Sequence, residues 1–180
     1  MMTIDPARAS IVEAVLLQPL FTDGCEVHFF EGLQGKKLYQ GVFKPVQDKN
    51  LSVVMSLPAD TGNTMFIALA DRAVPMVRRI VANLEEWSSE GNVSLGNIVL
   101  IENQELQASG YCGVILLPVS VSTILEALPE TIKVRDALYP VMLVVPVSDA
   151  EHQVWKSHGH DALMSFLDDT QKQIVFEQVV

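Results

Sequence analysis

The segment LYPVMLVVPV, at residues 138–147, most constrains the fold because it is apolar at nearly every position. A strand that alternates apolar and polar residues can leave one face in water, whereas this one has to bury both of its faces. We therefore predict a strand in the middle of a sheet. The run CGVILLPVSV, at residues 112–121, predicts a second buried strand. Both runs contain proline, and neither reaches the roughly 20 apolar residues of a membrane-spanning helix.

The residues after the first of these strands mark the start of a helix. Glu151 follows Ser148 by three positions, the spacing of a capping box, in which each side chain binds the other residue's backbone N–H group. We predict a helix that runs to about Ser157. Gly159 can break a helix, and the apolar pattern resumes beyond it to Leu167, so a second helical segment is expected. The expected core residues of the two segments are Val154, Trp155, Leu163, Phe166 and Leu167.

The middle of the chain predicts one strand and one long helix. Residues 51–57 alternate so that one face of a strand is wholly apolar: Leu51, Val53, Met55 and Leu57. Residues 74–87 have an apolar stripe at helical spacing, formed by Val77, Ile80, Val81 and Leu84. The charged residues expected off this stripe are Arg78, Arg79, Glu85 and Glu86. Pro75 has to lie in the first turn, since a proline inside a helix costs about 3 kcal/mol. Residues 64–70 fit either a strand or a helical turn.

The remaining segments complete an α+β pattern. We expect a helix that begins at Asp5-Pro6, a hairpin over residues 25–45, two adjacent strands joined by QELQA at 104–108, and a last strand near the C-terminus. Strands and helices in this order predict a single α+β domain over residues 1–180. Its sheet is expected to be mixed or mainly antiparallel and flanked by helices.

The charge of the chain limits its partners. It carries 22 acidic and 12 basic residues, for a net charge of −10. This charge opposes binding to nucleic acid and to anionic membranes. It suits a basic protein partner, although solubility alone also explains it. The N-terminus MMTIDPARAS has no basic region followed by an apolar stretch. Together with two cysteines, Cys25 and Cys112, which we interpret as buried reduced thiols, this predicts a cytoplasmic protein.

The sequence contains few patterns that point to chemistry. GLQGKKL, at residues 32–38, lacks the spacing of a phosphate-binding loop, and neither GxGxxG nor GxSxG occurs. Cys112 precedes an apolar strand, where burial raises the pKa of a thiol and makes it unreactive. We therefore expect no catalytic, cofactor-binding or metal-binding residue, and no cofactor.

The segment KSHGHD, at residues 156–161, is the strongest candidate for an exception. His158 and His160 are two residues apart, which on a helix turns their side chains about 200° from each other. A closed metal site needs three or four ligands, and no further matched cluster occurs. The simpler interpretation is a helix–Gly–helix joint with surface histidines. The alternative is a metal-dependent or acid–base enzyme centred on His158, His160 and Asp161, which predicts that these side chains converge in a pocket.

The same segment belongs to a longer pattern. An apolar strand ends in proline and is followed by a helix with an early Glu, then by Lys-x-x-Gly before an Ala-Leu pair; the positions are Pro146, Glu151, Lys156, Gly159, Ala162 and Leu163. Upstream, LSVVMSLPAD, PMVRRIVANLEEW and SSEGNVSLGN follow in the order strand, helix, turn. In this order and spacing, residues 35–170 resemble the suppressor-of-fused (SUFU)-like domains, as a bacterial member. One departure is that Ser52 and Val53 stand where family members often carry an acid.

This resemblance implies an α/β sandwich-like domain that binds protein and has no known catalytic activity. The animal namesake of the family holds transcription factors of the Hedgehog pathway, and bacterial members are commonly inferred to be immunity proteins that neutralise toxins. We therefore expect a non-catalytic protein-binding domain, with a basic toxin as its partner. An acidic, dimeric secretion chaperone is the alternative. No binding residue of the family is carried over to this chain.

Overall fold

The computed structural model describes residues 8–11, 26–31, 37–45, 48, 50–58, 64–88, 91, 93–126, 128–134, 136–172 and 174–177. Residues 8–11 are helical. The other elements, in chain order, are β1 (Glu26–Glu31), β2 (Lys37–Phe43), β3 (Ser52–Ser56), β4 (Met65–Ala70), α2 (Val74–Ser88), β5 (Ile98–Leu100), α3 (Gln104–Ala108), β6 (Gly113–Leu117), the 3-10 turn η1 (Val119–Val121), β7 (Thr131–Val134), β8 (Ala137–Val147), α4 (Asp149–His158), α5 (His160–Asp169) and β9 (Val175–Phe176).

The nine strands of the described residues form one mixed sheet in the order β1-β2-β3-β4-β8-β6-β5. Two strands lie off this path, because β7 pairs with β8 and β9 pairs with β4. The pairs β4–β8 and β4–β9 are parallel, and the other pairs are antiparallel. The predicted α+β class with a mixed, mainly antiparallel sheet is confirmed.

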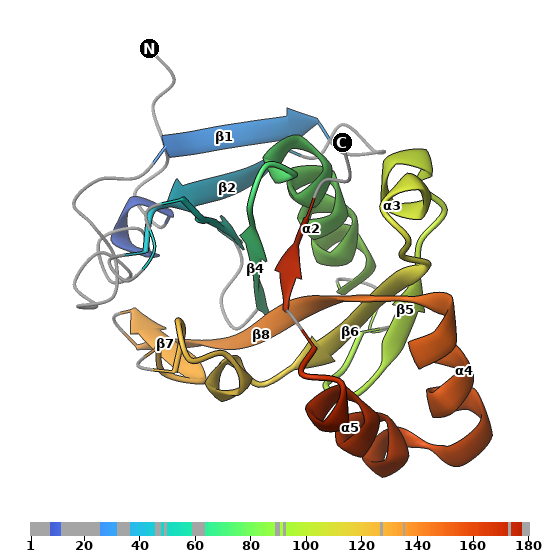
Figure 1. The fold of residues 1–180 in the computed structure, drawn as a ribbon. Coiled ribbons are helices and arrows are strands. Elements are labelled where there is room, and N and C mark those ends of the chain that lie inside the picture. The colour runs from blue at the N-terminus through green and yellow to red at the C-terminus, as the bar shows by residue number, and fades with distance from the viewer. Residues whose placement is uncertain are drawn as a thin grey trace.

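Strand β8 is the central element, as its sequence predicts. Its first residues pair with β7, its middle with β4 and its end with β6, and Figure 1 shows it running across the whole molecule. Its side chains enter the core on both faces of the sheet. Leu143 and Val145 belong to one hydrophobic cluster, and Val144 belongs to the other.

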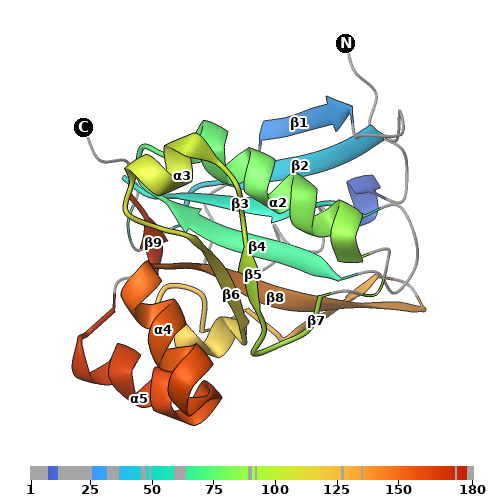
Figure 2. The same cartoon turned by 90° about the vertical axis from the view of Figure 1, so that its right-hand side faces the viewer.

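One face of the sheet is covered by α2 (Figure 2). The predicted stripe of Val77, Ile80, Val81 and Leu84 is fully buried against β3, β4, β6 and β8. Full burial of one such side chain stabilises the fold by about 1.5–3 kcal/mol. The helix begins at Val74 and so places Pro75 in its first turn. One detail of the prediction is wrong: Glu85 is only 7% exposed and not off the buried face.

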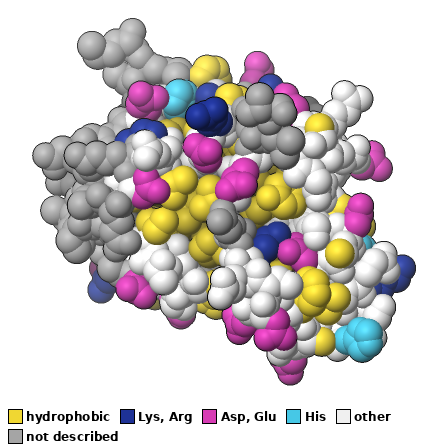
Figure 3. Space-filling view, viewed as in Figure 1, with side chains coloured by type: hydrophobic (Ala, Val, Ile, Leu, Met, Phe, Trp, Pro, Cys, Tyr) yellow, Lys and Arg dark blue, Asp and Glu magenta, His cyan; other side chains and the backbone are white. Residues whose placement is uncertain are grey.

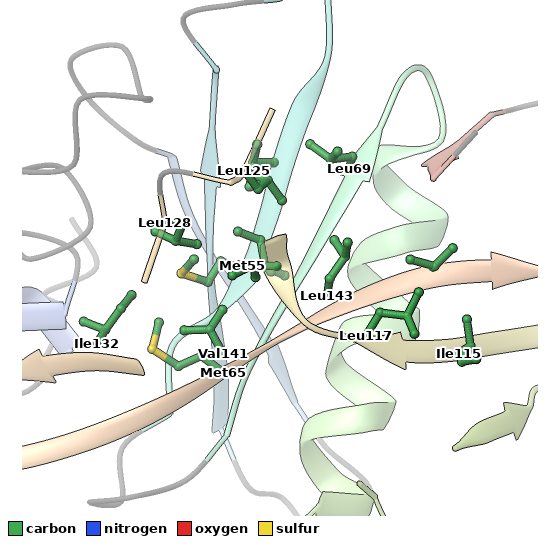
Figure 4. Packing of buried hydrophobic residues seen from close by; sticks show 14 of the residues in the cluster. Met55, Met65, Leu69, Ile115, Leu117, Leu125, Leu128, Ile132, Val141 and Leu143 are labelled. Atoms are coloured by element: carbon green, nitrogen blue, oxygen red, sulfur yellow. The ribbon is translucent and has the colours of Figure 1, made fainter. Parts of the chain in front are cut away.

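The opposite face is covered by several short segments. Leu163 and Leu167 of α5 pack there, together with Leu125 and Leu128 from the turns after η1. Figure 4 shows the last two near Met55 of β3, in the cluster that also contains Met65, Leu117 and Leu143 from three other strands. Residues 65–70, which fit either a strand or a helical turn, are strand β4 with all six side chains buried.

Other expectations have mixed outcomes. The strands before and after QELQA pair as β5 and β6, but QELQA itself forms α3, where the Asn103 side chain accepts a hydrogen bond from the Leu106 N–H group. The last strand is present as β9. Most of the helix expected after Asp5-Pro6, together with Cys25 and the loop at 32–35, lies outside the described residues. No helix among the residues that the structure describes is long and apolar enough to cross a membrane.

Candidate functional site: a groove at the joint between α4 and α5

The joint between α4 and α5 is formed by a single glycine. The Gly159 N–H group donates to the Trp155 carbonyl at 2.9 Å, and the Gly159 carbonyl accepts from the Leu163 N–H group at 3.2 Å. Gly159 therefore ends one helix and begins the next. Its backbone angles, φ 87° and ψ −174°, lie in a region that is essentially restricted to glycine.

The predicted capping box fixes the start of α4. The Ser148 hydroxyl accepts from the Glu151 N–H group at 3.3 Å, and the Glu151 carboxylate accepts from the Ser148 N–H group at 2.8 Å. Lys172 also contacts this carboxylate, at 2.8 Å, and both side chains are mostly buried. The Lys172 ammonium lies 5.2 Å from the centre of the Tyr111 ring. Glu151 therefore links α4 to the chain beyond α5.

The histidines of KSHGHD lie on the surface. His158 ends α4, His160 begins α5, and both side chains are exposed, as is Asp161 in the first turn of α5. The interpretation as a helix joint with surface histidines is confirmed. The His160 ring lies beside Gly96, in the turn before β5. Among the described residues, no three His, Cys, Asp or Glu side chains lie close enough to hold a metal ion.

Cys112, the other candidate, lies one residue before β6. It is half-buried and not fully enclosed as a core cysteine would be. Its thiol donates to the Val147 carbonyl at 3.5 Å. Burial, followed by the nearby Asp149 carboxylate, raises the pKa of the Cys112 thiol. The reactive thiolate is therefore disfavoured at this position.

A groove of about 670 Å³ opens beside the helix joint. Its apolar lining comes from distant segments of the chain: Leu95, Leu117, Pro118, Val121, Trp155 and Met164. Its polar lining includes Asn97, Lys156 and His160. We call it the joint groove. Figure 2 shows α5 near the lower ends of β5 and β6, and residues of these segments and of the adjoining turns line the groove.

The joint groove presents large apolar side chains to solvent. Leu95 is 51% exposed and Val121 is 48% exposed. Trp155, which the sequence places in the core, is only half-buried and lines the groove. Aromatic residues in such hollows often contribute most of the binding energy of an interface. The sequence gives no sign of the groove, because its lining comes from segments up to about 70 positions apart.

A smaller hollow continues from the joint groove. It measures about 180 Å³ and shares Leu117, Val121 and Met164 with the groove. Beyond them it is lined by residues that include Leu167, Asp168, Lys172 and Ile174. We call it the adjoining hollow.

The helix beside both hollows is acidic. α5 contains Asp161, Asp168 and Asp169 and has no Lys or Arg. Figure 3 shows acidic side chains gathered along the lower edge of the molecule, over α5, next to hydrophobic surface. Among the described residues, no Lys or Arg pairs with Asp168.

A third hollow lies between the start of α2 and α3. It measures about 310 Å³, and its lining includes Arg72, Met76 and Glu105. It contains none of the large hydrophobic side chains that are exposed on the described surface. The joint groove is therefore the better candidate for binding a partner.

Some residues of the SUFU-like pattern stabilise the fold, and others line the joint groove. Pro146 and Leu163 are buried in the core, and Glu151 holds the ion pair with Lys172. Lys156 and Gly159 line the joint groove. The pattern thus fixes the strand–helix–helix unit that forms one wall of the groove.

Comparison with known proteins agrees with this architecture at the level of the fold. No family model matches the sequence, and no curated protein does. Among solved structures, the chain is similar to a protein from Neisseria gonorrhoeae described as a "Putative SUFU (suppressor of fused protein) homolog", with a TM-score of 0.69. The alignment covers 94% of this chain and 93% of that chain, at 14% sequence identity. The chain therefore has the SUFU-like fold that its sequence predicts.

Proposed function

We propose that the chain is a non-catalytic protein-binding domain whose partner docks in the joint groove. The observation that carries the proposal is the exposure of Leu95 and Val121 beside Trp155 in one concave surface. Apolar side chains grouped in this way on a charged protein are typical of a protein-binding site. The resemblance of the sequence to SUFU-like domains also supports a binding role, because that resemblance implies a domain that binds protein.

We propose further that the partner is a basic toxin and that the chain neutralises it in the cytoplasm. The net charge of −10 favours the approach of a basic protein and speeds association. The three carboxylates of α5 place part of that charge beside the groove. Of His158, His160 and Asp161, His160 alone lines the joint groove, and this separation, together with the raised pKa of the Cys112 thiol, supports a non-catalytic role.

Co-expression with a toxin encoded in the neighbouring gene tests this proposal. We expect the chain to protect the cells and to co-purify with the toxin. Val121→Asp, which places a charge in the groove, should abolish both effects. Leu138→Asp is the matched control, because Leu138 is similarly exposed, at 57%, but does not line the groove. A result of no protection and no complex rejects the toxin as the partner.

The alternative, an acidic dimeric secretion chaperone, is favoured by one observation. Leu100 and Leu138 are also exposed, away from the joint groove, and would suit a broader apolar contact. This function requires a dimer, whereas the immunity function does not. Sedimentation of the purified chain as a monomer at micromolar concentration would exclude it.

A further inference from the structure

The structure also indicates which kind of segment the partner inserts. We propose that this segment carries two neighbouring apolar side chains, one for the joint groove and one for the adjoining hollow, followed by a Lys or Arg that pairs with Asp168. This inference rests on the proposed function, because it describes the partner of the same site.

The two hollows form one continuous surface. They share Leu117, Val121 and Met164, so a chain that fills the larger hollow lies next to the smaller one. A cavity of ~150 Å³ holds a benzene molecule. The adjoining hollow, at about 180 Å³, therefore has room for one leucine or phenylalanine side chain. The larger hollow accepts the first apolar residue and part of the backbone.

The charged side chains around the adjoining hollow determine which residue follows the two apolar ones in the partner's segment. Two charged side chains line the adjoining hollow, Asp168 and Lys172. The Lys172 ammonium is already compensated, since the buried Glu151 carboxylate contacts it at 2.8 Å. No described Lys or Arg compensates Asp168 in the same way. A partner that covers Asp168 removes its carboxylate from water, and this is unfavourable unless the partner supplies a cation.

The positions of the polar and charged side chains along α5 also determine how the partner's segment is oriented. Lys156 and His160 line the joint groove near the start of α5, whereas Asp168 lies near its end. The rise of an α-helix separates His160 from Asp168 by about 12 Å. The basic residue is therefore expected over the end of α5 and not over the joint. A second copy of this chain is a poor occupant, because two molecules of net charge −10 repel each other.

Two synthetic peptides of equal length test the inference by calorimetry. Both contain a pair of leucines one helical turn apart, flanked by lysines in one peptide and by glutamates in the other. We expect the lysine peptide to bind saturably and the glutamate peptide to bind at least about tenfold more weakly. Asp168→Asn should weaken the lysine peptide about tenfold, the effect of losing one partly buried ion pair. Val121→Asp should abolish its binding.

Asp169→Asn is the matched control, because Asp169 is also an exposed carboxylate of α5 but does not line either hollow. It should weaken the lysine peptide less than about threefold, the effect of general screening alone. The inference is overturned if the lysine peptide does not bind, if both peptides bind equally, or if the two Asp→Asn variants behave alike.

The toxin complex separates this inference from the proposed function. If Val121→Asp breaks the complex and Asp168→Asn does not, the assignment of Asp168 is wrong and the groove remains the binding site. If the unaltered chain forms no complex with the toxin, the toxin is not the partner, whatever the peptides do.

Discussion

On one face of the sheet the core is covered by one long helix, the 15-residue α2, with Leu106 of the short helix α3 in the same cluster. The other face is covered by η1, the turns after it and the pair α4–α5. The continuous helix presents one unbroken apolar stripe, which is fully buried. The helices α4 and α5 meet at Gly159, and the joint groove lies between them, η1 and the turn before β5. The hollow on the α2 side, between the start of α2 and α3, contains none of the exposed large hydrophobic side chains. The joint groove, which forms between several short pieces, keeps Leu95 and Val121 exposed for a partner.

Both faces of the sheet depend on β6, because this strand supplies side chains to each of them. Val114 and Leu116 pack on the face of the sheet that α2 covers, which we call the α2 face. Ile115 and Leu117 pack on the opposite face, which carries the helix joint and which we call the joint face. Gly113 begins this strand, and a Cβ atom there would lie 2.2 Å from the Val99 backbone oxygen of β5. The clash is with backbone atoms of β5, and β6 is also paired with β8 on its other edge, so β6 cannot easily shift to relieve the clash.

We therefore expect Gly113→Ala to destabilise both faces together, by about 4 kcal/mol in urea unfolding. The control is Gly91→Ala. Gly91 has a φ of +78°, but nothing lies within 4 Å of the added methyl group. That variant should lose only about 1 kcal/mol, the cost of holding an alanine at a positive φ. Equal losses in the two variants would show that β5 moves easily away from β6.

The difference between the faces is tested directly with two leucines. Leu84 of α2 is fully buried, and Leu95 on the joint groove is 51% exposed. Leu84→Ala should cost about 3 kcal/mol of unfolding free energy, because it leaves a cavity. Leu95→Ala should change stability by less than about 0.5 kcal/mol and should instead weaken binding of the partner. A large loss of stability for Leu95→Ala would mean that the groove is part of the core.

The helix joint can be altered without filling the groove. A methyl group at Gly159 meets nothing within 4 Å, so Gly159→Ala acts only through its φ of +87°. Such backbone strain costs about 1–3 kcal/mol, and we expect a loss of about 2 kcal/mol in thermal unfolding. Because the joint positions Trp155 and Met164, binding of the partner should weaken as well. Unchanged binding in this variant would indicate that the groove forms without a fixed joint.

The two regions also differ in how far the sequence predicts them. The stripe of α2, the buried strand β8 and the capping box at Ser148 follow from spacings of a few residues, and the structure confirms each of them. The joint groove brings Leu95, Val121 and Trp155 together from distant segments, so periodicity carries no trace of it. The ion pair of Glu151 with Lys172, 21 residues apart, depends likewise on how α5 returns the chain. Local patterns predict elements, whereas sites between elements depend on packing.

The smallest predicted effect concerns Cys112 and the joint face at alkaline pH. Burial and the neighbouring Asp149 raise the pKa of this thiol above its ordinary value of 9.0. Above pH 9.0 the thiol therefore ionises in the unfolded chain while it stays protonated in the folded one. Its contribution to stability is complete below that pH and is lost as the pH rises through the folded pKa.

Cys112→Ala removes this pH dependence of stability. The pKa of Tyr111, which burial also raises, should stay raised in the variant. Between pH 8 and about 10 we expect the unfolding free energy of the variant to fall less steeply than that of the unaltered chain. Urea titrations at several pH values measure both slopes. Since Cys112 hydrogen-bonds to Val147 at the end of β8, directly before α4, the weakening should begin on the joint face. As the pH is raised, backbone hydrogen exchange should therefore accelerate in α4 at a lower pH than in α2. The reverse order would place the pH-sensitive contact on the α2 face.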